Sequence, residues 1–429
     1  MQLIFAILIG KLILKLTRIL KTGGGSAAPG LYALKIEPNL VRKLTAQIPQ
    51  NIVITGTNGK TTTARILTHL VENQGLQGLK VIRNSTGSNL HRGIASSLIE
   101  KADLFGRIKG VDLGIWELDE AAFNHTIFDL KPQIIVFLNA FRDQLDRYGE
   151  VDTVTRKWRN TLEMIDWKPK VILNGGDPNT ASLGDIRDLD FSVFKIKNHR
   201  MWRERDLEIK DLRPDFEAKV IENNGLRGSK VELKLGKNKI SVEFSVPGIY
   251  HVYDLLAALS VFYHLNLKFE NLDKTLKNFK PAFGRVEKVQ ISKKDAYIFL
   301  IKNPAGANSV FETLAPELKQ DDVILAALND NFADGTDVSW IWDASFEKIV
   351  SNTHGKVICS GKRAHDLALR LKYAGFEPKN IDIVTQLGNA LEKAKKTKGR
   401  VFILPTYTAL LELQKILAKS GIKEEYWKS

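Results

Sequence analysis

The chain has 429 residues, of which 44% are hydrophobic and 26% are charged. This balance is typical of a globular protein of roughly two to four domains, and it excludes global disorder, a collagen-like chain and a protein of many membrane spans. The net charge of +14 favours a polyanionic partner, so nucleic acid, an anionic membrane surface and phosphorylated substrates all stay open. The single cysteine, Cys359, fits a reducing compartment and excludes an internal disulfide or a zinc site of several thiolates within this chain.

The first 21 residues combine regularly spaced basic residues with apolar ones. Lys11, Lys15, Arg18 and Lys21 follow at steps of four, three and three, which places them along one face of a helix. The uninterrupted apolar run ends at Lys11, short of the roughly 20 apolar residues that a spanning helix needs. A signal peptide would carry its charges before the apolar run. The pattern predicts an amphipathic helix that lies on an anionic membrane surface or a partner, or else packs on the body of the protein.

The remaining chain predicts an α/β fold. A glycine-rich connector over 23–30 ends an N-terminal segment that we place at 1–46. Strands alternating with helices then predict a central domain with a parallel sheet over 47–288, in which about 190–245 form an antiparallel β-rich insertion. A helix over about 252–265 precedes a C-terminal Rossmann-like α/β domain over 289–429. The predicted strands are 51–55, 113–117, 133–138, 170–173, 230–235, 239–244, 296–301, 322–328, 356–360, 380–384 and 400–404.

A glycine loop between a predicted strand and a predicted helix is the strongest functional motif. Its residues are Gly56, Thr57, Asn58, Gly59, Lys60, Thr61 and Thr62. Glycines let backbone N–H groups converge on phosphate oxygens, and the helix N-terminus adds partial positive charge. Lys60 could reach the terminal phosphates of a nucleotide, and the Thr61 hydroxyl could ligate Mg²⁺. The loop is shorter than the standard motif because position 54 is Ile, so an ordinary glycine turn is the alternative.

Acidic residues at the end of another predicted strand are candidates for holding that metal. Glu117 ends an apolar run, where its carboxylate could bind Mg²⁺ directly or through water. Asp119 and Glu120 follow it, and a solvated acidic turn that caps the next helix is a serious alternative for these two.

The glycine loop resembles the ATP loop of the Mur ligase family. Further segments resemble its MurT members, the synthetase subunits of lipid II isoglutaminyl synthase: 35–40, 139–150, 283–287, 302–306 and 328–343. The resemblance covers nearly the whole chain and implies a Mur ligase-type central ATP-binding domain followed by a MurT-type C-terminal domain.

The resemblance also implies a reaction. ATP would phosphorylate the α-carboxyl of D-glutamate in the stem peptide of lipid II, and ammonia would displace phosphate to leave D-isoglutamine. Lys60 and Mg²⁺ would neutralise charge on the transferred phosphoryl group. Cys359 follows no glycine elbow and is interpreted as a small buried residue, so ammonia would come from a separate GatD-like glutaminase. Such a protein would work in the cytoplasm, at the inner face of the cell membrane.

Four residues take roles only through the resemblance. Asp337 would complete the partner's Cys–His pair, the alternative being a turn aspartate. Arg285 would contact a nucleotide phosphate or else form an interdomain salt bridge. Lys157 lies near where other Mur ligases carry a carbamylated lysine that binds a second Mg²⁺, although a surface lysine is at least as good an interpretation. Asp146 would serve the magnesium-binding region or lie on a helix surface.

Two departures from the family pattern bear on ligands. MurT proteins commonly carry a four-cysteine zinc ribbon, but residues 190–230 hold no cysteine, so we expect no zinc. His251 and Asp254 stand where the family has two asparagines, of which the second meets adenine. A carboxylate can accept from the adenine 6-amino group but cannot donate, so the replacement affects nucleotide preference or affinity.

Two other functions stay open. A stand-alone amino-acid-adding Mur or folylpolyglutamate-type ligase would use an amine in place of ammonia, and the MurT-type C-terminal segments count against it. A nucleotide-gated protein held on a membrane surface by its basic N-terminus is the second. Nucleic acid is not favoured, because aromatic residues are not interleaved with the basic cluster.

Overall fold

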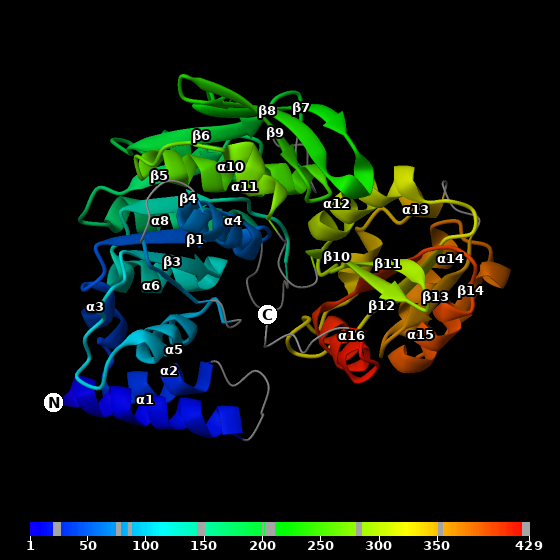
Figure 1. Cartoon of the computed structure of the whole chain (residues 1–429), viewed down its shortest axis with the longest axis horizontal. Coiled ribbons are helices and arrows are strands. Elements are labelled where there is room, and N and C mark those ends of the chain that lie inside the picture. Colours follow the sequence, from blue (N-terminus) through cyan, green and yellow to red (C-terminus); the bar gives the residue numbers. More distant parts are fainter. Residues whose placement is uncertain are drawn as a thin grey trace.

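The protein forms two α/β lobes (Figure 1). The computed structural model describes residues 1–19, 27–73, 79–84, 88–143, 151–199, 201, 211–279, 285–350 and 355–422. The first lobe holds a nine-stranded sheet in the order β2-β3-β1-β4-β5-β6-β7-β8-β9. Its strands are β1 (Gln50–Thr55), β2 (Val81–Arg83), β3 (Leu113–Leu118), β4 (Ile134–Phe137), β5 (Lys170–Asn174), β6 (Phe191–Ile196), β7 (Phe216–Asn223), β8 (Ser229–Leu235) and β9 (Asn238–Phe244).

Helices cover both faces of this sheet, which explains why its central strands are continuous apolar runs. One face packs against α4 (Lys60–Asn73), α10 (Ile249–His264) and α11 (Leu272–Lys277). The other packs against α3 (Leu40–Thr45), α5 (His91–Lys101), α6 (Glu120–Leu130) and α8 (Val151–Met164). Two further short helices belong to this lobe, α2 (Ala28–Ile36) beside α5 and α9 (Pro178–Ala181) after β5.

The second lobe holds a six-stranded sheet in the order β10-β11-β15-β12-β13-β14. Its strands are β10 (Arg285–Ile291), β11 (Lys294–Phe299), β12 (Val323–Ala327), β13 (Val357–Ser360), β14 (Ile381–Ile383) and β15 (Val401–Pro405). The helices are α12 (Pro304–Leu314), α13 (Glu347–Val350), α14 (Ala364–Tyr373), α15 (Leu387–Lys395) and α16 (Tyr407–Lys419). The first three pack on one face of the sheet and the last two on the other.

The strand predictions agree closely with this architecture. Each predicted strand is present with its ends within two residues of those expected, and the predicted 252–265 helix is α10. The β-rich stretch over 190–245 differs from the separate antiparallel insertion that we expected. It extends the central sheet, with β6 and β7 pairing in parallel, and only β7, β8 and β9 pair antiparallel. Strand β10 begins the second sheet at Arg285, inside the range expected for the central domain.

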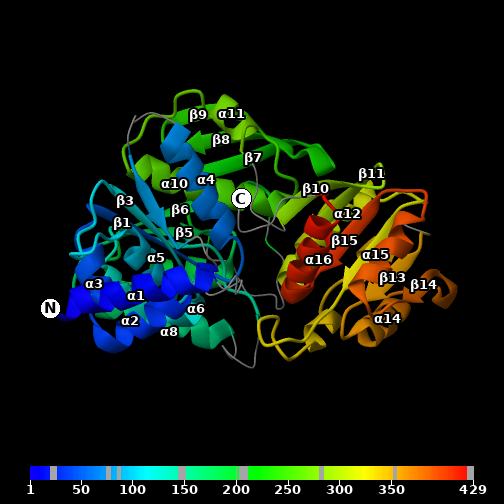
Figure 2. The same cartoon turned by 60° about the horizontal axis from the view of Figure 1, so that its bottom comes forward.

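The N-terminal helix α1 (Gln2–Ile19) packs on the body of the first lobe, against α2 and α5 (Figure 2). This confirms an N-terminal helix and matches the packing alternative. Among the described residues, no helix is both long enough and apolar enough to cross a bilayer.

Candidate active site

The glycine loop lies at the carboxyl end of β1, where strand register gathers several polar segments. Ile54 pairs with Glu117 on β3, and Thr55 pairs with Phe137 on β4, so the segments that follow these strands meet at one sheet edge. Such an edge is where open α/β sheets bind their ligands.

Two glycines of the loop are required by its geometry. Gly56 and Gly59 have φ values of +136° and +94°, a region that side chains rarely adopt. A Cβ at Gly56 would lie 2.9 Å from the backbone nitrogen of Asn139, and one at Gly59 would lie 2.1 Å from Asp254 Oδ1. The loop therefore has no room for side chains at these two positions, as expected for a backbone that approaches a phosphate closely.

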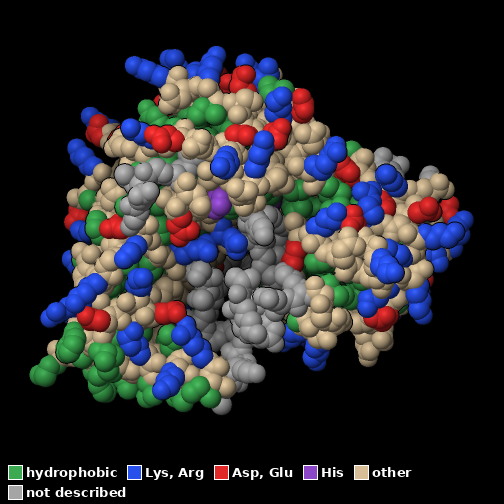
Figure 3. All heavy atoms as spheres, viewed as in Figure 1, with side chains coloured by type: hydrophobic (Ala, Val, Ile, Leu, Met, Phe, Trp, Pro, Cys, Tyr) green, Lys and Arg blue, Asp and Glu red, His purple; other side chains and the backbone are tan. Residues whose placement is uncertain are grey.

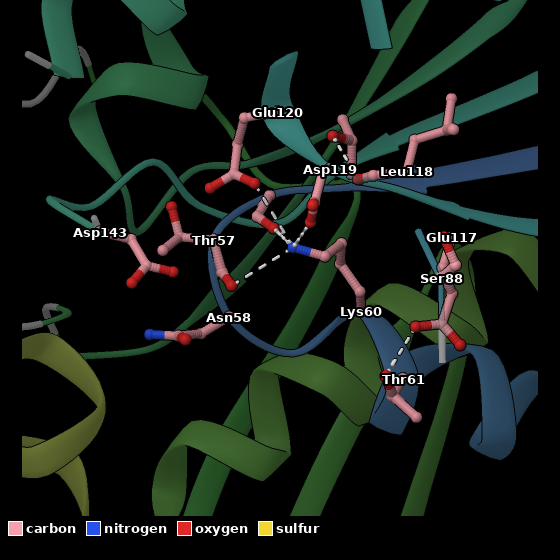
Figure 4. Close-up of polar contacts among 12 residues, drawn as sticks. Thr57, Asn58, Lys60, Thr61, Ser88, Glu117, Leu118, Asp119, Glu120 and Asp143 are labelled. Carbon is pink, nitrogen blue, oxygen red and sulfur yellow. Dashed lines mark hydrogen bonds and ion pairs between the residues drawn. The ribbon is translucent and has the colours of Figure 1, made fainter. Parts of the chain in front are cut away.

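Lys60, the first residue of α4, is buried at the centre of an acidic cluster (Figure 4). Its ammonium donates to the carbonyl oxygen of Gly56 and lies 3.5 Å from both Asp119 Oδ1 and Glu120 Oε2. Burial alone would lower the pKa of Lys60, but the carboxylates of Glu120 and Asp119 outweigh it and raise the pKa. The ammonium therefore stays charged although it is buried.

Glu120 is part of this cluster and does not lie in the solvated turn that we considered. It is buried, with 5% of its surface exposed. Burial favours the neutral acid, but the charges of Lys60 and Lys302 prevail and lower the pKa of Glu120. Asp119 does occupy the N-cap position of α6, as considered, but its carboxylate makes no capping hydrogen bond and turns to Lys60 instead.

Thr61 and Glu117 form the candidate magnesium site. The Thr61 hydroxyl donates to Glu117 Oε2 over 2.6 Å (Figure 4). The backbone of Glu117 is held on both sides by Asn84, whose amide accepts from its N–H and donates to its carbonyl oxygen, each over 2.9 Å. A hydroxyl beside a carboxylate suits Mg²⁺, which binds proteins through few oxygen ligands and keeps water or phosphate oxygens for the rest. The described residues include no group of three or more acidic, histidine or cysteine ligands.

A cleft lies between the glycine loop and the second lobe. Asn58 and Gly59 line it from the first lobe, and Lys302 and Val310 line it from the second. Lys302 reaches across, with its ammonium 2.6 Å from Asp143 Oδ2. Asp143 is buried, which raises the pKa of its carboxyl, and Lys302 opposes this rise.

An amide pair also joins the lobes beside this cleft. Asn58 Nδ2 donates to Asn303 Oδ1 over 3.2 Å, and Asn303 Nδ2 donates to Asn58 Oδ1 over 3.3 Å. Asn303 Oδ1 also accepts the N–H of Gly306 and so caps α12, whose first residue is Pro304. A residue of the glycine loop is thus connected directly to the N-terminus of a helix in the other lobe.

His251 and Asp254 form a buried pair in the wall of the cleft. His251 Nδ1 lies 2.9 Å from Asp254 Oδ2. The other carboxylate oxygen of Asp254 faces Gly59, as the close approach described above shows. Asp254 is therefore placed next to the phosphate loop.

Comparison with known proteins identifies the family. Residues 54–262 match the family described as Mur ligase middle domain, and residues 300–410 match the one described as MurT ligase C-terminal. Over 92% of its length the chain is 30% identical to the lipid II isoglutaminyl synthase (glutamine-hydrolyzing) subunit MurT of Staphylococcus aureus (strain COL), of which it covers 93%. The chain belongs to the MurT family. The subunit MurT of Streptococcus pneumoniae (strain ATCC BAA-255 / R6) is 28% identical, with 94% of both chains covered.

Solved structures show the same fold as this MurT family member. MurF from Acinetobacter baumannii superimposes with a TM-score of 0.68 at 16% identity, over 90% of this chain and 79% of that one. The MurF ligase from Thermotoga maritima in complex with ADP gives 0.67 at 16% identity, over 92% and 84%. The expected Mur ligase fold and family are confirmed.

The remaining predicted residues form no contact with Lys60 among those that the structure describes, or lie outside the described residues. Lys157 is exposed on α8. Asp337 is exposed in a loop of the second lobe, where hydrogen bonds from Ser339 lower the pKa of its carboxyl. Asp146 and the side chain of Arg285 lie outside the described residues. Thr62 belongs to the loop, but its side chain is buried within α4. The roles given to these residues by the MurT resemblance stay predictions.

Cys359 is buried on β13, and burial raises the pKa of its thiol to about 12. This agrees with a small core residue in place of a nucleophile.

The sequence did not point individually to five residues of the site. They are Asn84, Asn139, Asp143, Lys302 and Asn303. All of them except Asn84 lie in segments that carry the MurT resemblance. Only Asn303 had a local signal, because Asn followed by Pro is typical of a helix start.

Proposed function

We propose that this chain is the synthetase subunit of a lipid II isoglutaminyl synthase. It would use ATP to convert the α-carboxyl of D-glutamate in the lipid II stem peptide to an acyl phosphate, which ammonia then amidates. The relatives in the MurT family are named as subunits of a glutamine-hydrolyzing lipid II isoglutaminyl synthase, which supports the proposal. The single observation that carries the proposal is the buried Lys60 ammonium in a two-glycine loop that faces the MurT-type lobe.

The residues of the glycine loop supply the chemistry of the first step. A carboxylate is a poor electrophile, and an acyl phosphate gives it a good leaving group. Lys60 would stabilise negative charge that spreads over the transferred phosphoryl oxygens, which is the main contribution a protein makes to such a transfer. Thr61 and Glu117 would hold Mg²⁺, which supplies further charge neutralisation when bound. Asp254 and Arg285 would complete the nucleotide site, and Lys157, if carbamylated, would hold a second ion.

The ammonia would come from a GatD-like glutaminase on another chain. This chain offers only Cys359, whose buried, protonated thiol cannot act as the nucleophile of a glutaminase. Asp337 is exposed on the second lobe, where a partner's active site could reach it. With lipid II as substrate, the enzyme would work in the cytoplasm at the inner face of the membrane, without zinc or nucleic acid.

Reconstitution tests the proposal. The purified chain with a GatD-like partner, lipid II, ATP and glutamine should yield amidated lipid II and phosphate. Lys60→Ala and Glu117→Ala should each reduce the rate by at least about 100-fold, since each removes charge stabilisation from the phosphoryl transfer. Amidation that survives either change would refute the ATP site.

The role of Asp337 is tested separately by changing the nitrogen source. Asp337→Ala should abolish glutamine-driven amidation and leave ammonium-driven amidation at the wild-type rate. Equal loss with both nitrogen sources would reject a role in the partner's active site. Lys157→Ala tests the second ion. If Lys157 is a carbamylated ligand of that ion, the variant should lower the rate of ammonium-driven amidation, and an unchanged rate would reject the role.

A further inference from the structure

The outward side of α1 is largely apolar, with the exposed Lys15 inside it near one edge. Its apolar members are Ile4, Phe5, Leu8, Leu12, Leu16 and Ile19, which we call the outer face of α1. With 3.6 residues per turn, these positions fall within an arc of about 120°. Phe5 is 57% exposed, Leu12 53% and Ile19 66%, although each is a residue type that proteins normally bury. Figure 3 shows apolar side chains gathered at this lower edge of the molecule.

The opposite side of α1 fixes the helix to the first lobe. Ala6, Ile7 and Gly10 are fully buried there. The helix approaches α5 so closely that a Cβ at Gly10 would lie 2.9 Å from Ile99 Cδ1. Packing of these three residues against the first lobe therefore keeps the outer face of α1 turned toward solvent.

A neighbouring loop extends the apolar surface. Leu104 and Phe105, between α5 and β3, are 56% and 68% exposed. The next residue, Gly106, contacts α1, since a Cβ there would lie 3.1 Å from Ile7 Cδ1 and 3.2 Å from Leu3 Cδ2. The two exposed side chains thus lie close to the first turns of α1.

Basic residues border the apolar surface toward the C-terminal end of α1. Lys11, Lys15 and Arg18 line a groove that Leu14, Ile19 and Glu100 complete. Arg18 pairs with Glu100, and Lys11 donates to the carbonyl oxygen of the same residue over 3.3 Å. The groove thus holds three basic side chains and one acidic one, Glu100, so this border is net positive.

We propose that the outer face of α1, together with Leu104 and Phe105, docks this protein on an anionic lipid bilayer. The helix would lie in the plane of the membrane, with its apolar side chains among the acyl chains and its basic border at the phosphate groups. This inference adds a membrane-binding surface to the proposed function. Only the reason for binding a membrane, access to lipid II, depends on that function.

Charge favours a bilayer over a second copy of this chain as the occupant. Two α1 helices packed face to face would bring together two borders that are both net positive, since each has three basic side chains and one acidic one, Glu100. An anionic headgroup layer matches both the apolar centre and the basic border.

Vesicle co-sedimentation tests the surface without catalysis. The full chain is mixed with phosphatidylcholine vesicles that contain either no or about 30% phosphatidylglycerol, in the absence of ATP and lipid II. We expect binding to the anionic vesicles that weakens as NaCl rises. Leu12→Gln with Leu16→Gln should weaken this binding by about tenfold or more, because both side chains leave the acyl region. Lys15→Gln should weaken it by about fivefold and have little effect with neutral vesicles.

Matched controls separate the possible outcomes. Leu369→Gln with Ile383→Gln removes two equally exposed apolar side chains from the other lobe, at 48% and 44%, and should leave vesicle binding unchanged. Lys60→Ala should also bind vesicles like the wild type, so a failure of the catalytic assignment would not be mistaken for a failure here. Absence of binding to anionic vesicles, or equal binding by the Leu12 and Leu16 double variant, would overturn the proposal. So would a shift of that variant from dimer to monomer in light scattering, since the face would then be a self-interface.

Discussion

Replacing Glu120 with Gln measures how the protein keeps a charged lysine buried. The substitution keeps the side-chain size and removes one of two carboxylates that lie 3.5 Å from Lys60 Nζ. The Glu120 side chain is 6% exposed, so its charge is poorly screened, whereas that of Asp119 is 27% exposed. Breaking a buried ion pair completely costs about 3–5 kcal/mol. Since Asp119 stays, we expect Glu120→Gln to lower the free energy of unfolding by about 2 kcal/mol.

Urea denaturation at neutral pH provides the measurement, and Asp119→Asn is the matched control. Because Asp119 is better solvated, its replacement should cost less than about 1 kcal/mol. If Asp119→Asn lowers the free energy of unfolding as much as Glu120→Gln does, then burial does not determine how much each carboxylate stabilises the fold. That result would refute the prediction.

The same pair of proteins gives a pH test. The pKa of Glu120 is lowered in the folded protein from its usual value of 4.5. A carboxylate of this kind stabilises the fold fully above its unfolded pKa, and the contribution is lost as pH falls through the lowered folded pKa. The stability difference between wild type and Glu120→Gln should therefore be constant above about pH 6 and shrink below about pH 4. A difference that grows on acidification would contradict the assigned direction.

Three further substitutions test packing, burial and capping. Gly30→Ala should destabilise the fold by about 1–3 kcal/mol in urea, because its Cβ would lie 2.0 Å from the carbonyl oxygen of Arg92; an unchanged midpoint would refute this close approach. Burial raises the pKa of Asp177 to about 6, so the folded protein holds its proton more tightly than the unfolded chain. The free energy of unfolding of the wild type, relative to that of Asp177→Asn, should therefore fall by up to about 3 kcal/mol between about pH 4 and pH 7. A rise over this range would contradict the direction of the pKa shift. Asn303→Asp keeps an acceptor for capping α12, so it should be about 1 kcal/mol more stable than Asn303→Ala in thermal unfolding, although both lose the donor to Asn58; equal stability would show that the cap contributes nothing.

The sequence predicted those features that depend on neighbouring residues. The glycine loop could be predicted because a strand end, two glycines and a helix start follow one another within a few residues. The strands of the central sheet could be read because burial on both faces makes each an apolar run. Strands β2, β6, β7 and β10 were not predicted. The interpretation of 190–245 as an insertion rested on β8 and β9, where alternating polar residues mark one exposed side of the sheet.

Features that depend on contacts between distant residues could not be read in the same way. Asp119, Glu120 and their neighbours look like an acidic helix start, and nothing local shows that one carboxylate turns to Lys60 and is buried. Likewise, the basic spacing in α1 suggested an amphipathic helix but could not decide between lipid and protein contacts. The structure shows that Ala6, Ile7 and Gly10 pack inward while the larger apolar residues face outward, so the two alternatives do not exclude each other.

The amide pair between Asn58 and Asn303 has a consequence for how the lobes respond to a nucleotide. The two residues are 245 positions apart, so no local pattern joins them. Asn58 belongs to the loop whose backbone would contact phosphates, and its N–H donates to Asn139 Oδ1 over 2.9 Å. Asn303 caps a helix whose residues line the opposite wall of the cleft. A shift of the glycine loop on binding phosphate would therefore either break the amide pair or move the N-terminus of α12 with it.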